Sequence, residues 1–198
     1  MQKEIAFFDF DGTITRKDTM LELAAFHAGR AAFLWKMIGM SPSLIALKLK
    51  LTSAQKAKEV FLTRFFGGME INNFNLLCEE FCKTKLPALI REDALYMLNM
   101  HKASAAEVVV VTASASNWVK PWCTQNGITC ISSELQILNS RITGKLEGNN
   151  CNGKEKVSRI KALFNLADFK TIYAYGDSSG DRPMLNIATQ PGFRVFKQ

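Results

Sequence analysis

Three short apolar runs stand out along the chain, and each is followed by a polar segment. The runs are four residues long and cover Ile5–Phe8, Val108–Val111 and Ile172–Tyr175. Their β-branched and aromatic side chains, without regular polar alternation, are typical of strands buried on both faces of a parallel sheet. The polar segments behind them would meet at the carboxyl edge of that sheet, where open α/β sheets bind ligands.

The stretch between the first two runs has mostly helical patterning. A connection of about 90 residues without structure of its own is unusual in a compact domain, so we predict an inserted helical cap over the site. Gly and Pro mark its break points at 39–42, 67–68 and 87. The predicted helices are Thr19–Phe26, Ala31–Met40, Leu44–Leu51, Ala54–Phe66, Asn72–Lys83 and Ile90–Met100. We therefore predict an α/β core from residues 1–15 and 101–198, with residues 16–100 as the cap.

The second half of the chain alternates between helical and strand patterns. Helices are predicted at Asn117–Asn126, with Gly127 as a stop, and at Lys154–Phe164. Between them, Glu134–Leu138 and Arg141–Leu146 flank an Asn-Ser pair and predict a β-hairpin.

Composition narrows the class of protein. Hydrophobic residues make up 47% of the 198 residues and charged residues 22%, as in ordinary globular proteins. The start of the chain lacks a secretory signal pattern, and its five cysteines follow neither zinc nor CxxC spacing, so we predict a cytoplasmic protein with reduced thiols. The apolar stretch from 31 to 51 contains three lysines and a proline, so no transmembrane segment is predicted.

The net charge of +7 favours anionic partners. The basic residues are scattered, and no nucleic-acid motif is present, so we expect a small phosphorylated substrate and no nucleic acid. The oligomeric state stays open.

The first polar cluster contains two acids directly behind a predicted strand. Asp9 and Asp11 flank Phe10, and the Gly12-Thr13 pair that follows allows a tight turn whose N–H groups bind an anion. One carboxylate can attack phosphorus while the other protonates the leaving alcohol and later activates water. The plain alternative is a polar strand-to-turn junction.

The second cluster follows the third strand and carries two more acids. Asp177 and Asp181 lie four residues apart, with Ser178 between them. Several carboxylates beside a phosphate would repel it unless a hard cation lies among them, and this predicts Mg²⁺. By itself the segment also fits a loop with an Asp helix cap.

A phosphate held by a metal needs further donors. Thr112 ends the second strand, where its hydroxyl and the N–H of Ala113 can bind phosphate oxygens. A lysine at the start of the next helix, Lys154 or Lys156, would neutralise the nucleophile and the transferring group. We favour Lys156.

These four clusters, in this order, resemble the haloacid dehalogenase superfamily over nearly the whole chain. The resemblance implies a Rossmann-like core with a cap and a Mg²⁺ ion held by Asp9, the carbonyl of Asp11 and Asp177, with Asp181 as ligand or support. Asp9 would be the nucleophile, Asp11 the acid and base, and Thr112 and Lys156 would complete the catalytic set.

The helical cap and the segment 150–157 are similar to the phosphoserine-phosphatase-like branch (subfamily IB). The resemblance implies that Asp18 matches the acid that contacts the substrate amine there. Arg64 lies near the place of the branch's carboxylate-binding arginine, but its flanking residues differ. The candidate substrate-binding residues are Gly12, Thr13, Asp18, Arg64, Ala113 and Ser178.

The predicted function is a Mg²⁺-dependent phosphatase that hydrolyses a phosphate monoester through an aspartyl-phosphate. A phosphotransferase or mutase would share that intermediate. A hydrolase of phospholipid-derived phosphates at a membrane surface, or a silent lipid-surface protein, would use the basic, Met-rich and Trp-containing segment 33–51.

Overall fold

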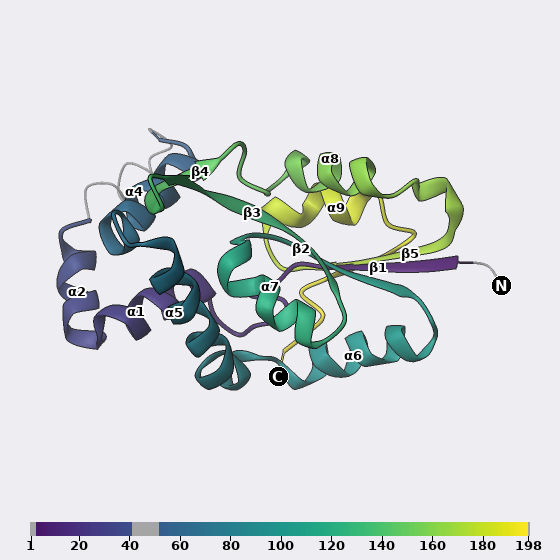
Figure 1. Ribbon diagram of the computed structural model, residues 1–198. Helices are drawn as coiled ribbons and strands as arrows, with labels where there is room; N and C mark the ends of the chain where they lie inside the picture. Colours follow the sequence, from purple (N-terminus) through teal and green to yellow (C-terminus); the bar gives the residue numbers. More distant parts are fainter. Residues whose placement is uncertain (1–2, 41–51, 198) are drawn as a thin grey trace.

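The computed structural model describes residues 3–40 and 52–197 and confirms the predicted α/β fold (Figure 1). Six strands in this part of the chain form one sheet in the order β4-β3-β2-β1-β5-β6. Neighbouring strands run parallel except β3 and β4, which are antiparallel. The strands are β1 Lys3–Phe8, β2 Glu107–Ala115, β3 Thr129–Leu138, β4 Arg141–Glu147, β5 Phe169–Gly176 and β6 Gln190–Phe193.

Helices cover both faces of the sheet and form a cap beyond its carboxyl edge. Figure 1 shows α8 and α9 on one face, α6 and α7 on the other, and the cap helices α1, α2, α4 and α5 together at one end. The helices are α1 Thr19–Ala28, α2 Arg30–Ile38, α4 Ala54–Phe66, α5 Ile71–Thr84, α6 Glu92–Ala103, α7 Ser116–Gln125, α8 Lys154–Leu163 and α9 Arg182–Asn186. The predicted helix Leu44–Leu51 lies outside the described residues. Within the described ranges, no helix has the length and apolar character needed to cross a membrane.

The central strands supply apolar side chains to two hydrophobic layers. In β1, Ile5 and Phe7 belong to the layer that contains Ile160 of α8, whereas Ala6 and Phe8 belong to the opposite layer. All four β1 side chains are fully buried. This explains why the strand shows no polar alternation in the sequence, since both of its faces are covered.

The cap and the core share one continuous hydrophobic cluster. Phe61 and Phe66 of α4 and Phe74 of α5 lie in the same cluster as Phe8 of β1 and Trp118 of α7. Helix α6, most of which the sequence assigns to the cap, instead packs against β2. The division at residue 100 stays a prediction, and the position of α6 favours a boundary nearer its first residue.

The hairpin predicted around Asn139 and Ser140 is present, and the φ values of these two residues, 50° and 59°, fit a type I′ turn. Two further strand features were not predicted from the sequence. The first strand of the hairpin, β3, begins already at Thr129 and also pairs in parallel with β2. Strand β6 is short and contains Pro191, which an edge strand tolerates because one side needs no ladder hydrogen bond.

Candidate active site

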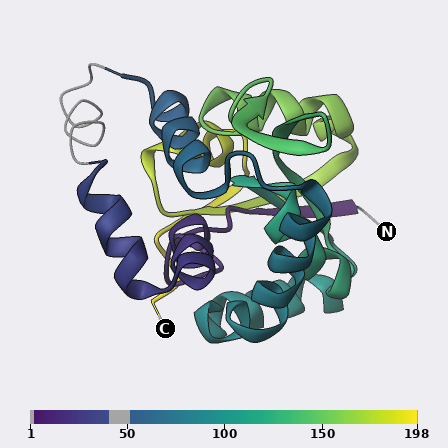
Figure 2. The same ribbon diagram turned by 60° about the vertical axis from the view of Figure 1, so that its left-hand side comes forward.

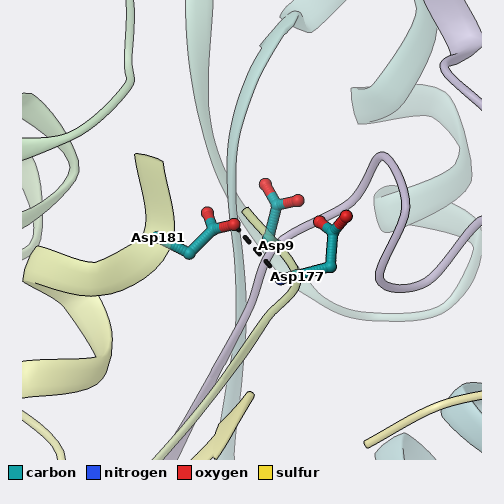
Figure 3. Close-up of side chains that lie close together, drawn as sticks. All are labelled: Asp9, Asp177 and Asp181. Carbon is teal, nitrogen blue, oxygen red and sulfur yellow. Dashed lines mark hydrogen bonds between the residues drawn. The ribbon is translucent and has the colours of Figure 1, made fainter. Parts of the chain in front are cut away.

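Asp9 and Asp177 emerge side by side at the carboxyl edge of the sheet. Asp9 directly follows β1 and Asp177 directly follows β5. The parallel register pairs Phe8 with Tyr175, and the Asp9 N–H donates to the Tyr175 carbonyl at 2.9 Å. The sheet therefore brings together two acids that are more than 160 residues apart in the sequence. Figure 3 shows both carboxylates beside Asp181.

A buried lysine joins two of these acids into a charge network of Asp9, Lys156 and Asp181. The Lys156 ammonium donates to Asp9 Oδ1 at 2.5 Å and to Asp181 Oδ1 at 2.7 Å. Its side chain is 1% exposed, and Ile160, one helical turn further along α8, is also buried. Lys154 is exposed. The structure therefore brings the favoured lysine of the two to the site.

The second oxygen of Asp181 organises the loop after β5. It accepts a hydrogen bond from the Asp177 N–H at 3.2 Å (Figure 3). It also accepts from the Ser178 N–H at 2.9 Å and from the Ser178 hydroxyl at 2.7 Å. Both oxygens of Asp181 are thus engaged by protein donors. This favours a supporting role for Asp181 over direct metal ligation.

The site holds more negative charge than its lysine compensates. Burial raises the pKa of Asp9 to about 7, and the Asp181 carboxylate adds to this rise while the Lys156 ammonium opposes it. Burial and the Asp181 charge also raise the pKa of Asp177. Burial would lower the pKa of Lys156, but the Asp9 and Asp181 carboxylates raise it overall. A further cation would therefore be stabilised here.

The donor set suits a small hard cation. Asp9, Asp177 and Asp181 each offer a carboxylate oxygen, and these atoms lie within 4.8 Å of one another. Mg²⁺ prefers oxygen ligands and retains waters, so one or two free carboxylates and a carbonyl are a suitable set. The residues present fit the predicted ion.

Asp11 is fixed in place by hydroxyl and amide donors. Its Oδ1 accepts from the Thr19 N–H at 2.7 Å and the Thr19 hydroxyl at 2.6 Å, and its Oδ2 accepts from the Ser114 hydroxyl. Behind it, the buried Trp118 indole donates to Thr19 Oγ1 at 3.0 Å. Ser114 was not among the predicted site residues, because its role depends on how β2 lies beside the loop after β1.

Gly12 and Thr13 lie against Asp177 instead of lining the cavity. The Thr13 hydroxyl donates to Asp177 Oδ1 at 3.3 Å. Gly12 has a φ of +82°, and a Cβ there would lie 2.5 Å from Asp177 Oδ2. The structure thus assigns these two residues to positioning Asp177, and their predicted contact with substrate stays a prediction.

A cavity of about 390 Å³ opens between the core and the cap. Its core side contains the predicted residues Asp9, Asp11, Thr112, Ala113, Lys156, Ser178 and Asp181, together with Ser114 and Asn152. Its cap side, the cap wall, is mainly apolar and includes Met20, Leu21, Met37, Met40, Ala57 and Phe61.

Lys58 of α4 is, like Ser114, a site residue that sequence reasoning missed. It lines the cavity, and its ammonium donates to the Ala113 carbonyl at 2.5 Å and to Asn150 Oδ1 at 3.3 Å. Burial lowers its pKa, while the Asp11 and Asp18 charges act in the opposite direction. In the sequence it is one of two lysines on an amphipathic helix, and no local pattern distinguishes it.

The two predicted cap residues have different positions. Asp18 lines the cavity, and its carboxylate accepts from the Leu21 N–H as the N-cap of α1. Arg64 is exposed, and its Nε donates to the Lys36 carbonyl at 3.1 Å, so it is not among the described lining residues. The structure therefore brings Asp18, but not Arg64, to the site.

The sheet order, the acids at its carboxyl edge and the helical cap define a capped α/β protein with an acidic site between cap and core. The sequence model of the haloacid dehalogenase-like hydrolases matches residues 6–186. The chain therefore belongs to this family, as predicted. It is 36% identical over 194 residues to protein CicA of Caulobacter vibrioides, covering 96% of this chain and 85% of that protein. It is also 26% identical to a probable phosphatase of Mycobacterium tuberculosis over 91% of this chain and 64% of the other.

Solved structures confirm the fold. A Bordetella pertussis protein of unknown function superposes with a TM-score of 0.82 at 24% identity, covering 96% of this chain and 89% of the other. A phosphoserine phosphatase that carries an analogue of its phospho-aspartyl intermediate superposes with a TM-score of 0.64 at 20% identity, covering 96% and 86%. The fold is thus that of the predicted phosphoserine-phosphatase-like branch.

Proposed function

We propose that this protein is a Mg²⁺-dependent phosphatase that transfers the phosphoryl group of a monoester to Asp9 and then to water. The observation that carries the proposal is the placement of Asp9 at the cavity, with Lys156 on one side and Asp11 held close by. Membership of the hydrolase family and the similarity to a probable phosphatase support the same reaction class.

Asp9 and Asp177, with the Asp11 carbonyl, would hold the metal ion. When bound, Mg²⁺ supplies positive charge that screens the phosphate from the carboxylates and stabilises the charge of the transferring group. Asp181 would keep Asp177 and Lys156 in place through its two engaged oxygens. Lys156 adds a fixed positive charge beside the nucleophile.

In the first half-reaction, an Asp9 oxygen attacks phosphorus and the ester P–O bond breaks. Asp11 gives its proton to the departing alkoxide, which leaves as the alcohol. The Thr112 hydroxyl and the Ala113 N–H would bind phosphate oxygens. Thr19 and Ser114 fix the orientation of the Asp11 carboxyl. Proton transfer to the oxygen of the leaving group requires such a fixed orientation.

In the second half-reaction, Asp11 takes a proton from a water molecule, whose oxygen attacks the phosphorus of the aspartyl-phosphate. The bond between phosphorus and Asp9 breaks, inorganic phosphate leaves, and Asp9 returns as a carboxylate. A phosphotransferase would use a second alcohol in place of this water.

Release of phosphate from p-nitrophenyl phosphate tests the proposal. We expect turnover with Mg²⁺ and none from the Asp9→Asn variant. Adding glycerol or a sugar as a competing acceptor distinguishes the alternatives, because a phosphatase releases phosphate in equal amount to p-nitrophenol. A large deficit of phosphate, matched by a new phosphate ester, would identify a transferase. Absence of turnover on a panel of phosphate monoesters, with protein that is folded, would support the silent alternative.

A further inference from the structure

The two sides of the active-site cavity differ in chemistry. The core side carries the acids and Lys156, whereas the cap wall offers methionine, leucine and phenylalanine side chains. The charged cap residues in the cavity are already engaged: Asp18 accepts from an N–H of its own helix, and Lys58 donates to Ala113 and Asn150. A polar leaving group would lose hydrogen bonds to water against this wall, but an apolar one would not. The cavity therefore favours a monoester of an apolar alcohol.

Helix α2 forms part of the cap wall and also carries apolar side chains on its outer face. Met37 lines the cavity, whereas Leu34, Trp35 and Ile38 are 60%, 74% and 63% exposed. With the exposed Ala31 they occupy positions i, i+3, i+4 and i+7, which is one face of a helix. We name these four residues the outer stripe. Figures 1 and 2 both show α2 at the outer edge of the cap.

The sequence around the outer stripe carries charge of one sign. From residue 23 to residue 58 the sequence contains no Asp or Glu. The same stretch contains six basic residues, namely Arg30, Lys36, Lys48, Lys50, Lys56 and Lys58, of which Lys58 lines the cavity and does not contribute to the surface charge. Protein interfaces are depleted in lysine, whereas a helix with apolar and basic residues matches an anionic lipid surface. This charge pattern favours a lipid surface over a second copy of the chain.

We propose that the outer stripe of α2 docks on anionic membranes, and that the cavity accepts phosphate monoesters of apolar, lipid-like alcohols from that surface. The inference rests on the proposed phosphatase function, whose chemistry stays unchanged. The same helix would face the lipid on one side and the alcohol chain on the other. Substrate and membrane are thus recognised next to each other.

Tryptophan fluorescence gives a direct test of docking. Trp35 is exposed, whereas the other two tryptophans, Trp118 and Trp122, are buried, so a change in emission reports on α2. With vesicles of phosphatidylcholine and phosphatidylglycerol we expect a blue shift and quenching by brominated acyl chains, both weakened by salt. Pure phosphatidylcholine vesicles should give much less. Trp35→Phe should lose the signal but still float with the vesicles.

A double variant with a matched control tests the outer stripe itself. Leu34→Ser with Ile38→Ser should weaken vesicle binding by about tenfold or more, because two exposed apolar side chains no longer enter the lipid. Leu76→Ser with Tyr96→Ser removes side chains of similar exposure, 63% and 65%, on α5 and α6, and should bind like the wild type. Equal binding by all three proteins would overturn the proposal. So would a wild-type dimer that the Leu34/Ile38 variant converts to a monomer.

A chain-length series tests the substrate class. We expect kcat/KM to rise from ethyl to hexyl to decyl phosphate, and to exceed that for glycerol phosphate. The Leu34/Ile38 variant should lose activity on decyl phosphate carried in anionic vesicles but keep its turnover of p-nitrophenyl phosphate without vesicles. Full activity on p-nitrophenyl phosphate with no gain along the series would overturn this inference and leave the phosphatase intact. No activity on any of them would instead overturn the proposed function.

Discussion

The core side of the cavity, which we call the core edge because it lies at the carboxyl edge of the sheet, faces the cap wall, and the two are built in opposite ways. At the core edge, Asp9, Lys156 and Asp181 form a closed network of buried charges, contributed by the end of β1, by helix α8 and by the turn before α9. Across the cavity, the cap wall consists mainly of apolar side chains on α1, α2 and α4. Rigid, mutually bonded charges suit a reaction that is the same for every substrate. A wall of methionine and phenylalanine suits selection by shape and apolar contact.

Removing the nucleophile at the core edge should cost the most activity. Asp9→Asn should lower kcat by about four orders of magnitude or more and abolish the phosphoenzyme, because an amide does not attack phosphorus. Acid quenching followed by mass spectrometry measures the phosphoenzyme. The loss should be the same for every substrate, since the core edge does not select among them. A phosphoenzyme formed by the Asp9→Asn variant would show that another residue is the nucleophile.

Removal of the metal should have a similarly general effect. In excess chelator, activity should fall to background on both small and large substrates, because the carboxylates then repel the phosphate dianion. Added Mg²⁺ should restore it, and Ca²⁺ should do so poorly since it prefers more ligands and looser geometry. Full turnover in excess chelator would contradict the proposed role of Asp9 and Asp177.

A smaller loss is expected at Asp11, and it should depend on the leaving group. Asp11→Asn should slow turnover by about 100- to 10,000-fold, because the general acid and base is lost while the nucleophile remains. With p-nitrophenyl phosphate, whose leaving group needs no proton, the phosphoenzyme should still form and then accumulate. A stopped-flow burst of p-nitrophenol measures this. Equal slowing of both half-reactions would argue against a separate acid and base role.

Lys58 of the cap contacts the core edge, so its substitution tests which of the two regions this residue serves. Lys58→Met should lower kcat/KM by about tenfold or more, because a charged hydrogen bond to the Ala113 carbonyl is lost beside the phosphate site. Lys56→Met, on the same helix but exposed, is the matched control and should change little. Equal losses on aryl and long-chain phosphates would place Lys58 with the core chemistry. A loss confined to the long-chain substrate would place it with the cap wall.

The core edge could be predicted from the sequence far better than the cap wall, for a physical reason. Asp9, Thr112 and Asp177 each stand at or just behind the end of an apolar run, and a parallel sheet necessarily gathers such ends at one edge. Cap residues lack such a rule, because their positions depend on helix packing. Lys58 was therefore missed. Arg64 was predicted to bind substrate, but its side chain bonds to the Lys36 carbonyl and does not line the cavity.

Short-range patterns also explain which elements were missed. The hairpin turn was predicted because Asn139 and Ser140 carry a local signal for left-handed backbone. Strand β6 has no such signal, since Pro191 and Gly192 are poor strand formers and the strand depends on its neighbour β5. Ser132 and Ser133, two adjacent polar residues in β3, likewise hid the first half of a strand that pairs with β2.

The smallest expected effect lies outside both regions, at His101 of α6. Its Nε2 lies 2.8 Å from the Tyr175 hydroxyl in a buried site, and burial lowers the pKa of this histidine below its ordinary value of 6.5. The unfolded chain therefore binds a proton more readily than the folded one. The contribution of His101 to the free energy of unfolding therefore stays constant above pH 6.5. It decreases as the pH falls through 6.5, the pKa of the histidine in the unfolded chain. Urea unfolding between pH 7.5 and pH 5.5 (about one unit on either side of the unfolded value) measures the slope.

The His101→Gln variant isolates that contribution, because glutamine keeps a hydrogen-bonding group for Tyr175 but does not titrate in this range. The variant should be less stable at neutral pH, since the ring contacts with Tyr173 and Phe8 are lost, yet its stability should fall less steeply with acid. Activity per folded molecule should stay unchanged, because His101 lies among neither the core edge nor the cap wall residues. An unchanged slope would show that His101 is as readily protonated in the folded protein as in the unfolded chain. A loss of activity without a loss of folded protein would show that the sheet transmits changes at α6 to the core edge.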